Sequence, residues 1–171
     1  TRSCIRTASG EIRLKAYVTS ESPYIIVEAE ATEGEKDFRW QFYPESTDSP
    51  RQLNAILKKS KNHFKKDYIS NPASQLYERN GLNYCWQPLL AGGGTATVWK
   101  EIRKGNKSVL VISNAHSFPE TDALKKAETA LANLQTADIS LLRQAHRDWW
   151  HNYYPQSFIS LPDKKIENFY W

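Results

Sequence analysis

The sequence predicts a mainly β protein with C-terminal helices, an antiparallel β-sandwich followed by two linker helices. Three observations point to this class. About seven or eight short segments of strand character, separated by turn residues, fill the first 115 residues. Only one basic window among them has a helical pattern. After Asn114 the apolar period changes from two to about 3.5, so the strands precede the helices in the chain.

The composition supports a folded domain. The 171 residues are 40% hydrophobic and 25% charged, which fits one domain of ordinary size, with or without a short appendage. The mean hydropathy of -0.66 and the absence of a long apolar run exclude a membrane-spanning helix. Aromatic residues make up 12% of the chain, which argues against full disorder.

The N-terminal part predicts three strands. Residues 12–18 alternate between apolar and polar side chains, as in a strand with one buried face. Residues 24–29 are β-branched and largely apolar, which favours a strand buried on both faces. Apolar rings recur at every second position in residues 38–43. Short turns between these segments favour antiparallel pairing.

Residues 51–66 form a basic window with six Lys or Arg side chains and no acid. The net charge of the whole chain is only +4, so the remainder is slightly acidic. The apolar positions allow a short amphipathic helix. We interpret the window as a solvated insertion. Binding of a nucleic-acid backbone is the alternative, since lysine clusters attract phosphates.

The strand pattern resumes after the basic window. Residues 76–79 and 82–86 predict a hairpin, because Asn80-Gly81 supplies both positive-φ positions of a two-residue turn. Residues 95–99 and 109–112 flank a further turn at 104–106. The three glycines at 92–94 lead into a strand and predict a bend. Phosphate-binding loops instead lead into a helix.

Two helices are expected next. Pro119 is placed to begin the first, with apolar residues spaced at about 3.5 up to Leu134. Asp138 is placed to begin the second, and Pro155 to end it. Asp163 then caps a third helical pattern that reaches the last residues, which are aromatic. We expect that helix to continue in a longer parent protein; docking on its own domain is the alternative.

No catalytic set, metal site or cofactor site emerges from the residue types and spacings. His146 and His151 lie about 140° apart around a helix and cannot share a metal ion. We expect His146 to form a hydrogen bond across a packing interface. Cys4 and Cys85 are expected to be buried thiols, with a disulfide in an oxidising compartment as the alternative.

The second linker helix carries two consecutive aromatic pairs, Trp149-Trp150 and Tyr153-Tyr154. Neighbouring residues on a helix diverge by about 100°, so one ring of each pair faces away from the domain. Such rings either form an exposed patch or are covered by a second surface. The sequence therefore predicts an interaction surface here.

Residues 146–155 read HRDWWHNYYP, residues 157–162 read SFISLP, and the chain ends in NFYW. This stretch resembles the joint between the N-terminal β-sandwich and the (α/α)6 barrel of six-hairpin glycosidases, such as the α-L-fucosidase-like family 95 and relatives from carbohydrate-degrading bacteria. Residues 91–99, AGGGTATVW, resemble a late sandwich strand of that group. The resemblance covers residues 75–171 well and the earlier strands only by pattern.

The resemblance implies a sandwich of the galactose mutarotase-like type at residues 1–116, with 45–74 as a basic insertion or loop. Residues 117–163 would be linker helices and an extended segment, and 164–171 would begin a helix of the missing barrel. The acid and base of that family lie in the barrel, so no catalytic residue can be assigned here. The resemblance also implies a periplasmic or secreted protein.

The function expected from this resemblance is a non-catalytic sandwich and linker that supports the barrel of a bacterial glycoside hydrolase acting on plant or host glycans. The expected docking or carbohydrate-binding residues are aromatic, apart from one histidine: His146, Trp149, Trp150, Tyr153, Tyr154, Phe169, Tyr170 and Trp171. A stand-alone carbohydrate-binding module is the first alternative, and a nucleic-acid-binding domain that uses residues 51–66 is the second.

Overall fold

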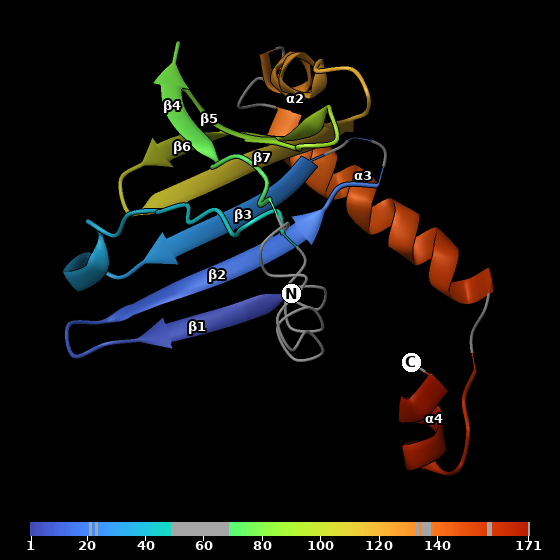
Figure 1. The fold of residues 1–171 in the computed structure, drawn as a ribbon. Helices are drawn as coiled ribbons and strands as arrows, with labels where there is room; N and C mark the ends of the chain where they lie inside the picture. The colour runs from blue at the N-terminus through green and yellow to red at the C-terminus, as the bar shows by residue number, and fades with distance from the viewer. Residues whose placement is uncertain are drawn as a thin grey trace, which may run out of the picture.

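The computed structural model describes residues 1–20, 22, 24–48, 69–132, 134, 138–156 and 159–170, excluding the side chain of Tyr170 (Figure 1). The predicted basic window at 51–66 lies outside these residues. The strands are β1 (Arg2–Arg6), β2 (Glu11–Val18), β3 (Tyr24–Ala31), β4 (Gln75–Arg79), β5 (Leu82–Pro88), β6 (Gly94–Lys104) and β7 (Lys107–Ser117). The helices are α2 (Ala123–Ala132), α3 (Asp138–Tyr153) and α4 (Lys164–Tyr170), with short 3-10 turns η1 (Glu33–Glu35) and η2 (Tyr154–Gln156).

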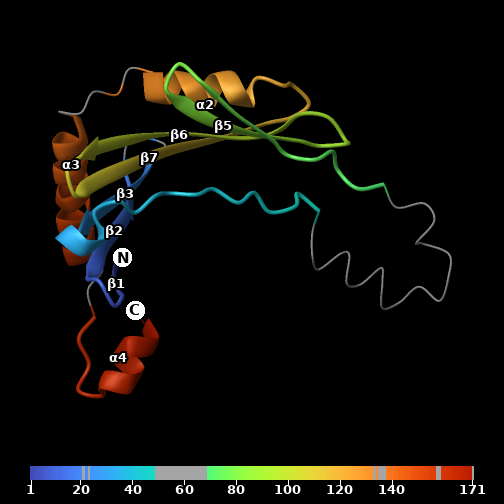
Figure 2. The same ribbon diagram turned by 90° about the vertical axis from the view of Figure 1, so that its left-hand side faces the viewer.

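The predicted class, mainly antiparallel β with C-terminal helices, is confirmed. The seven strands within the described residues join one antiparallel sheet in the order β1-β2-β3-β7-β6-β5-β4. Figure 2 shows this sheet strongly curved, which is consistent with a sandwich-like fold. The β3–β7 pairing joins segments about 80 residues apart, and all other neighbours in the sheet follow one another in the chain.

The core lies between one face of the sheet and α2. Strand register places Ile26 opposite Val111, and Tyr84 opposite Val98, so these four fully buried side chains share a face. Ala123, Ala127 and Leu131 of α2 pack onto that face and are also buried. These three helix residues recur every four positions, which gives α2 its single apolar stripe.

Lys100 of β6 fixes the C-terminal end of α2. Its ammonium donates to the carbonyl oxygens of Leu131 at 3.5 Å and Leu134 at 2.5 Å. A cation at this position satisfies carbonyls that have no partner within the helix and interacts favourably with the helix dipole. Burial lowers the pKa of Lys100, because desolvation penalises its charged form.

The predicted turns are confirmed. Asn80 and Gly81 both have positive φ, at 53° and 73°, and connect β4 to β5 as a two-residue turn. The predicted glycine bend precedes β6, and Gly93 has a φ of 67°. A Cβ atom at Gly93 would lie 2.1 Å from the carbonyl oxygen of Ser117, so no other residue fits there without displacing the backbone.

Several expected boundaries were wrong. Residues 38–43 are not a strand. The segment 36–48, which follows β3 and η1, crosses the face of the sheet opposite α2 instead of pairing within the sheet (Figure 2). The first helix begins at Ala123 instead of Pro119, which lies in a bend; the Ala123 N–H donates to Ser117 Oγ at 3.1 Å. Strand β1 was not expected as a separate element, and β6 and β7 are each longer than predicted.

The remaining helices confirm the expected order. Helix α3 runs from Asp138 to Tyr153 and is followed by η2, which contains Pro155, the residue predicted to end the helix. Figure 1 shows its C-terminal half extending past the ends of β2 and β3. Helix α4 is capped as expected, since the Asp163 carboxylate accepts from the Lys165 N–H at 2.8 Å. Within the described residues no helix has the length and apolar character to cross a membrane.

Candidate functional site

The aromatic surface consists of Trp149, Trp150, Tyr153 and Tyr154, on the part of α3 that extends past the sheet, and on η2. Trp149, Tyr153 and Tyr154 are 41%, 48% and 45% exposed. Trp150 is less exposed, as the 100° divergence of neighbouring helix positions predicts for one member of a pair. Tyr153 and Tyr154 are both exposed, because Tyr154 begins the 3-10 turn.

The four rings hold one another in place through stacking four residues apart. Trp149 lies nearly parallel to Tyr153, with centroids 4.9 Å apart and planes 8° apart. Trp150 stacks on Tyr154 at 5.1 Å, and the two tryptophans meet edge to face at 4.8 Å. Such pairs restrict rotamers before any partner binds. The structure therefore brings these four predicted residues together into one preorganised surface.

His146 connects the aromatic surface to the sheet. Its ring lies 6.2 Å from Trp150 and 5.1 Å from Tyr17 of β2. The expected hydrogen bond is wrong, since buried Nδ1 finds no hydrogen-bond partner among the residues that the structure describes. His146 instead packs as a ring. No ring contact within the described residues joins this cluster to α4.

Helix α4 presents its apolar residues to solvent. Phe169 is 95% exposed and Ile166 is 58% exposed. The helix spans only residues 164–170, so this apolar face is short. Of the other predicted residues, Trp171 and the side chain of Tyr170 lie outside the described part of the chain.

Arg143, near the start of α3, ties the helix to the sheet through Glu28 of β3. Its Nε and Nη2 lie 2.9 Å and 2.8 Å from Glu28 Oε1, and the Tyr17 hydroxyl donates to the same oxygen at 2.9 Å. Burial and the bond to Glu28 raise the pKa of Tyr17 to about 12. Glu28 is therefore part-buried and paired.

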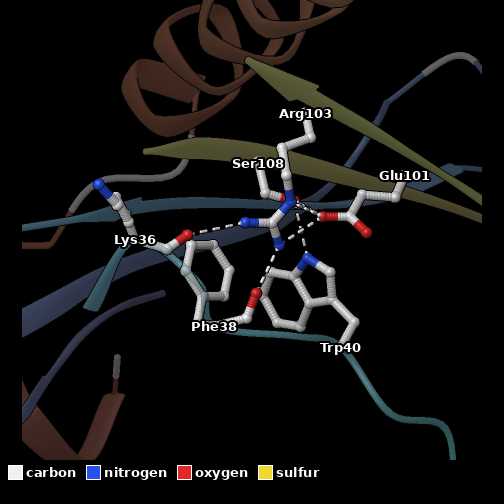
Figure 3. Close-up of polar contacts among 6 residues, drawn as sticks. All are labelled: Lys36, Phe38, Trp40, Glu101, Arg103 and Ser108. Atoms are coloured by element: carbon white, nitrogen blue, oxygen red, sulfur yellow. Dashed lines mark hydrogen bonds and ion pairs between the residues drawn. The ribbon is translucent and has the colours of Figure 1, made fainter. Parts of the chain in front are cut away.

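A second polar cluster anchors the segment 36–48 on the other face (Figure 3). Arg103 of β6 donates to the carbonyl oxygens of Lys36 at 3.1 Å and Phe38 at 2.7 Å, and its guanidinium lies 4.4 Å from the Phe38 ring centroid. Trp40 Nε1 donates to Ser108 Oγ at 2.8 Å. Ser108 in turn donates to Glu101 at 2.6 Å. These contacts replace the strand hydrogen bonds that this segment was expected to form.

The two thiols have different surroundings. Cys85 is buried, as expected, and burial raises the pKa of its thiol. The expectation for Cys4 was wrong, because it is exposed on the edge strand β1. Both are free thiols. Among the described residues, no group of three or more His, Cys, Asp or Glu side chains could hold a metal ion.

Sequence reasoning missed a charged hollow next to α3. This hollow has a volume of about 830 Å³ and is lined by β1, β2, β3, the start of β7 and Arg143. Its charged side chains alternate along β1 and β2, which is a visible signal in the sequence. Their convergence depends on which strands pair, and no single segment carries that information.

Comparison with known proteins adds no identity to these observations. No protein-family model and no curated protein sequence matches the chain.

Proposed function

We propose that this chain is the non-catalytic sandwich and linker of a bacterial glycoside hydrolase of the six-hairpin type, which acts on plant or host glycans. In this proposal the aromatic surface of α3 docks on the (α/α)6 barrel and holds it against the sheet domain. A periplasmic or secreted location belongs to the same proposal. Its sequence support is the resemblance of residues 75–171 to the sandwich–barrel joint of that group.

One structural observation carries the proposal. Three half-exposed aromatic rings lie on the portion of α3 that extends past the sheet and on the adjoining turn η2. Ile139 is the only buried residue among those described in α3. Large rings that gather on one surface mark contact sites in soluble domains. Their mutual stacking restricts the side-chain rotamers before a protein partner binds. Less conformational entropy is therefore lost when the surface docks on that partner.

The test compares hydrogen exchange in the 171-residue chain and in the full parent protein. We expect the amides of residues 147–153 to be at least about tenfold better protected in the parent, because docking suppresses local opening of α3. In the parent, the double variant Trp149→Ala/Tyr153→Ala should lose this added protection. Tyr43→Ala is the matched control, because it removes a ring that is 72% exposed and belongs to the segment 36–48 instead of α3.

Two results would contradict the proposal. One is a parent reading frame without an (α/α)6 barrel. The other is equal protection of residues 147–153 in the chain and in the parent.

A stand-alone carbohydrate-binding module is the second candidate. The parallel pair Trp149 and Tyr153 favours it, since exposed ring faces with polar ends suit sugar stacking. This candidate predicts that neutral oligosaccharides bind the 171-residue chain and that Trp149→Ala abolishes the binding. Calorimetric titration with no heat for any neutral glycan would leave barrel docking as the role of the aromatic surface.

A further inference from the structure

We propose that the charged hollow binds an acidic oligosaccharide through its carboxylate or sulfate groups. The hollow has a volume of about 830 Å³, within the range of pockets that hold small ligands. The anionic character of the ligand is inferred from the hollow alone. The choice of a glycan as its carrier rests on the proposed function.

Strand register explains how the hollow forms. On its first side, Arg2 lies opposite Lys15, and Lys15 lies opposite Glu28. A second row of paired positions lies two residues further along the strands. It crosses β1, β2, β3 and β7 at Cys4, Arg13, Glu30 and Lys107. Both rows point to the face that α3 partly covers, because side chains two residues apart share a face. The row between them points away and leaves the backbone as the floor.

The hollow has more cations than anions. Its six basic side chains are Arg2, Arg6, Arg13, Lys15, Lys107 and Arg143. Three carboxylates line it, and each has a basic partner. Glu11 pairs with Arg13, Glu28 with Arg143 at 2.8 Å, and Glu30 with Lys107 at 3.1 Å. The remaining three cations form no ion pair within the described part of the hollow, although Arg6 lies opposite Glu11 and Lys15 opposite Glu28.

The remaining cations are Arg2, Arg6 and Lys15. Arg2 and Lys15 occupy directly opposite positions on β1 and β2, where like charges repel. A bound anion between them would relieve that repulsion. Arg2 and Arg6 share one face of β1 and lie about 13 Å apart along the strand, which suits a ligand with more than one anionic group. Arginine is suited to this task, because its fork binds carboxylate or sulfate through two parallel hydrogen bonds.

Edge protection does not account for this arrangement. Charges on an edge strand prevent pairing with other sheets, and Arg2 and Arg6 alone would suffice for that on β1. The charged rows continue inward, however, through Arg13 and Lys15 of β2 and Lys107 of β7, which are not edge strands. On the same face, the other half of the sheet is apolar and covered by α2. The polarity therefore changes where the hollow begins.

A glycan fits the hollow better than a nucleic acid. Single-stranded nucleic acids are held by rings on which bases stack, in addition to cations. None of the described residues that line the hollow is aromatic. Its lining supplies cations and carboxylates, which match the acidic groups and the hydroxyls of a charged sugar.

The test is calorimetric titration of the 171-residue chain with four probes: a sulfated oligosaccharide, a uronic-acid oligosaccharide, a neutral oligosaccharide of the same length, and inorganic sulfate. We expect one or both acidic oligosaccharides to bind, with affinity that falls as salt is raised, and the neutral one not to bind. Arg2→Gln/Lys15→Gln should weaken binding at least about tenfold. Lys125→Gln, an exposed lysine of α2, is the control and should leave the affinity unchanged.

The outcomes separate the sources of the anion. Preference for the sulfated or the uronic-acid probe identifies the acidic group. If inorganic sulfate binds as tightly as the oligosaccharides do, the assignment of a glycan as the ligand would be overturned. Absence of binding by both acidic probes, or equal binding by the Arg2→Gln/Lys15→Gln variant, would overturn the site. Neither result affects barrel docking, which depends on α3 and is measured in the parent protein.

Discussion

Tyr17 is the residue at which the sheet, the charged hollow and the aromatic surface meet. Its hydroxyl donates to Glu28, which also receives Arg143 from α3. Its ring contacts His146, the first ring of the series that leads to Trp150 and Tyr154. One side chain in β2 therefore orients the start of α3, and through it the direction in which the helix leaves the sheet.

The raised pKa of Tyr17 predicts a loss of stability at high pH. The folded-state pKa is about 12 and the ordinary value is 10, so the folded protein holds this proton more tightly than the unfolded chain. The resulting contribution to stability is complete below pH 10 and is lost as the pH rises towards 12. We expect the free energy of unfolding, measured by denaturant titration, to fall between pH 9 and pH 11 by more in the wild type than in Tyr17→Phe.

The matched control for this pH experiment is Tyr43→Phe, which changes an exposed ring and should keep the wild-type dependence. Tyr24 and Tyr84 also have a raised pKa through burial, and their contribution is common to all three proteins. At neutral pH, Tyr17→Phe should cost roughly 0.5–1.5 kcal/mol, the usual worth of one hydrogen bond. An identical pH dependence of the free energy of unfolding in the wild type and in Tyr17→Phe would show that Tyr17 does not cause the loss of stability.

At the scale of elements, the segment 36–48 differs most from its pattern. Rings at every second position are typical of a strand, and here they serve a different purpose. Phe42 packs on Trp99 at 4.8 Å, and Trp40 reaches Ser108 with its indole N–H. The period-two pattern reports that one side of an extended segment is buried. It does not report whether the backbone pairs with a neighbouring strand.

Arg103 is expected to hold this segment against the sheet. Arg103→Ala removes the two donors to Lys36 and Phe38 and the cation over the Phe38 ring. We expect limited trypsin digestion to cleave after Lys36 or Arg39 several times faster than in the wild type, because local opening exposes the backbone to the protease. Lys104→Ala removes an exposed neighbour and should leave the rate unchanged. Equal cleavage rates in both variants would show that Arg103 does not anchor the segment.

At the scale of the whole molecule, the two halves of the sheet have different roles. Strands β5 to β7, together with Ile26 of β3, carry the apolar face that α2 covers. Strands β1 to β3 carry the charged face of the hollow. The C-terminal half of α3 contributes no buried residue among those that the structure describes. The stability of the domain should therefore come from the apolar half of the sheet and α2.

Removal of residues 147–171 tests this division. We expect the free energy of unfolding to change by less than about 1 kcal/mol, because α3 beyond His146 adds nothing to the buried core. Leu131→Ala in the full chain is the comparison. Leu131 is fully buried, and the cavity should cost about 2–5 kcal/mol by denaturant titration. A loss on truncation as large as that of Leu131→Ala would mean that the aromatic surface belongs to the core.

The sequence by itself determined the local structure and the class. Asn80-Gly81 defines its turn, the period of two defines β2, the β-branched apolar run defines β3, and Asp138 and Pro155 bound α3. Each of these depends on preferences within a short window of sequence. The paired aromatics of α3 were likewise visible from helical geometry alone.

Only the tertiary structure decided which strands became neighbours. The β3–β7 pairing places Glu28 beside Val109 and Glu30 beside Lys107, and so assembles the charged hollow from residues that have no common local pattern. The tertiary structure also made Glu28 a partner of Arg143 of α3 and left Cys4 exposed on the edge strand β1. Pairing between distant segments is selected by burial and charge summed over the entire sheet, a quantity that no single segment contains.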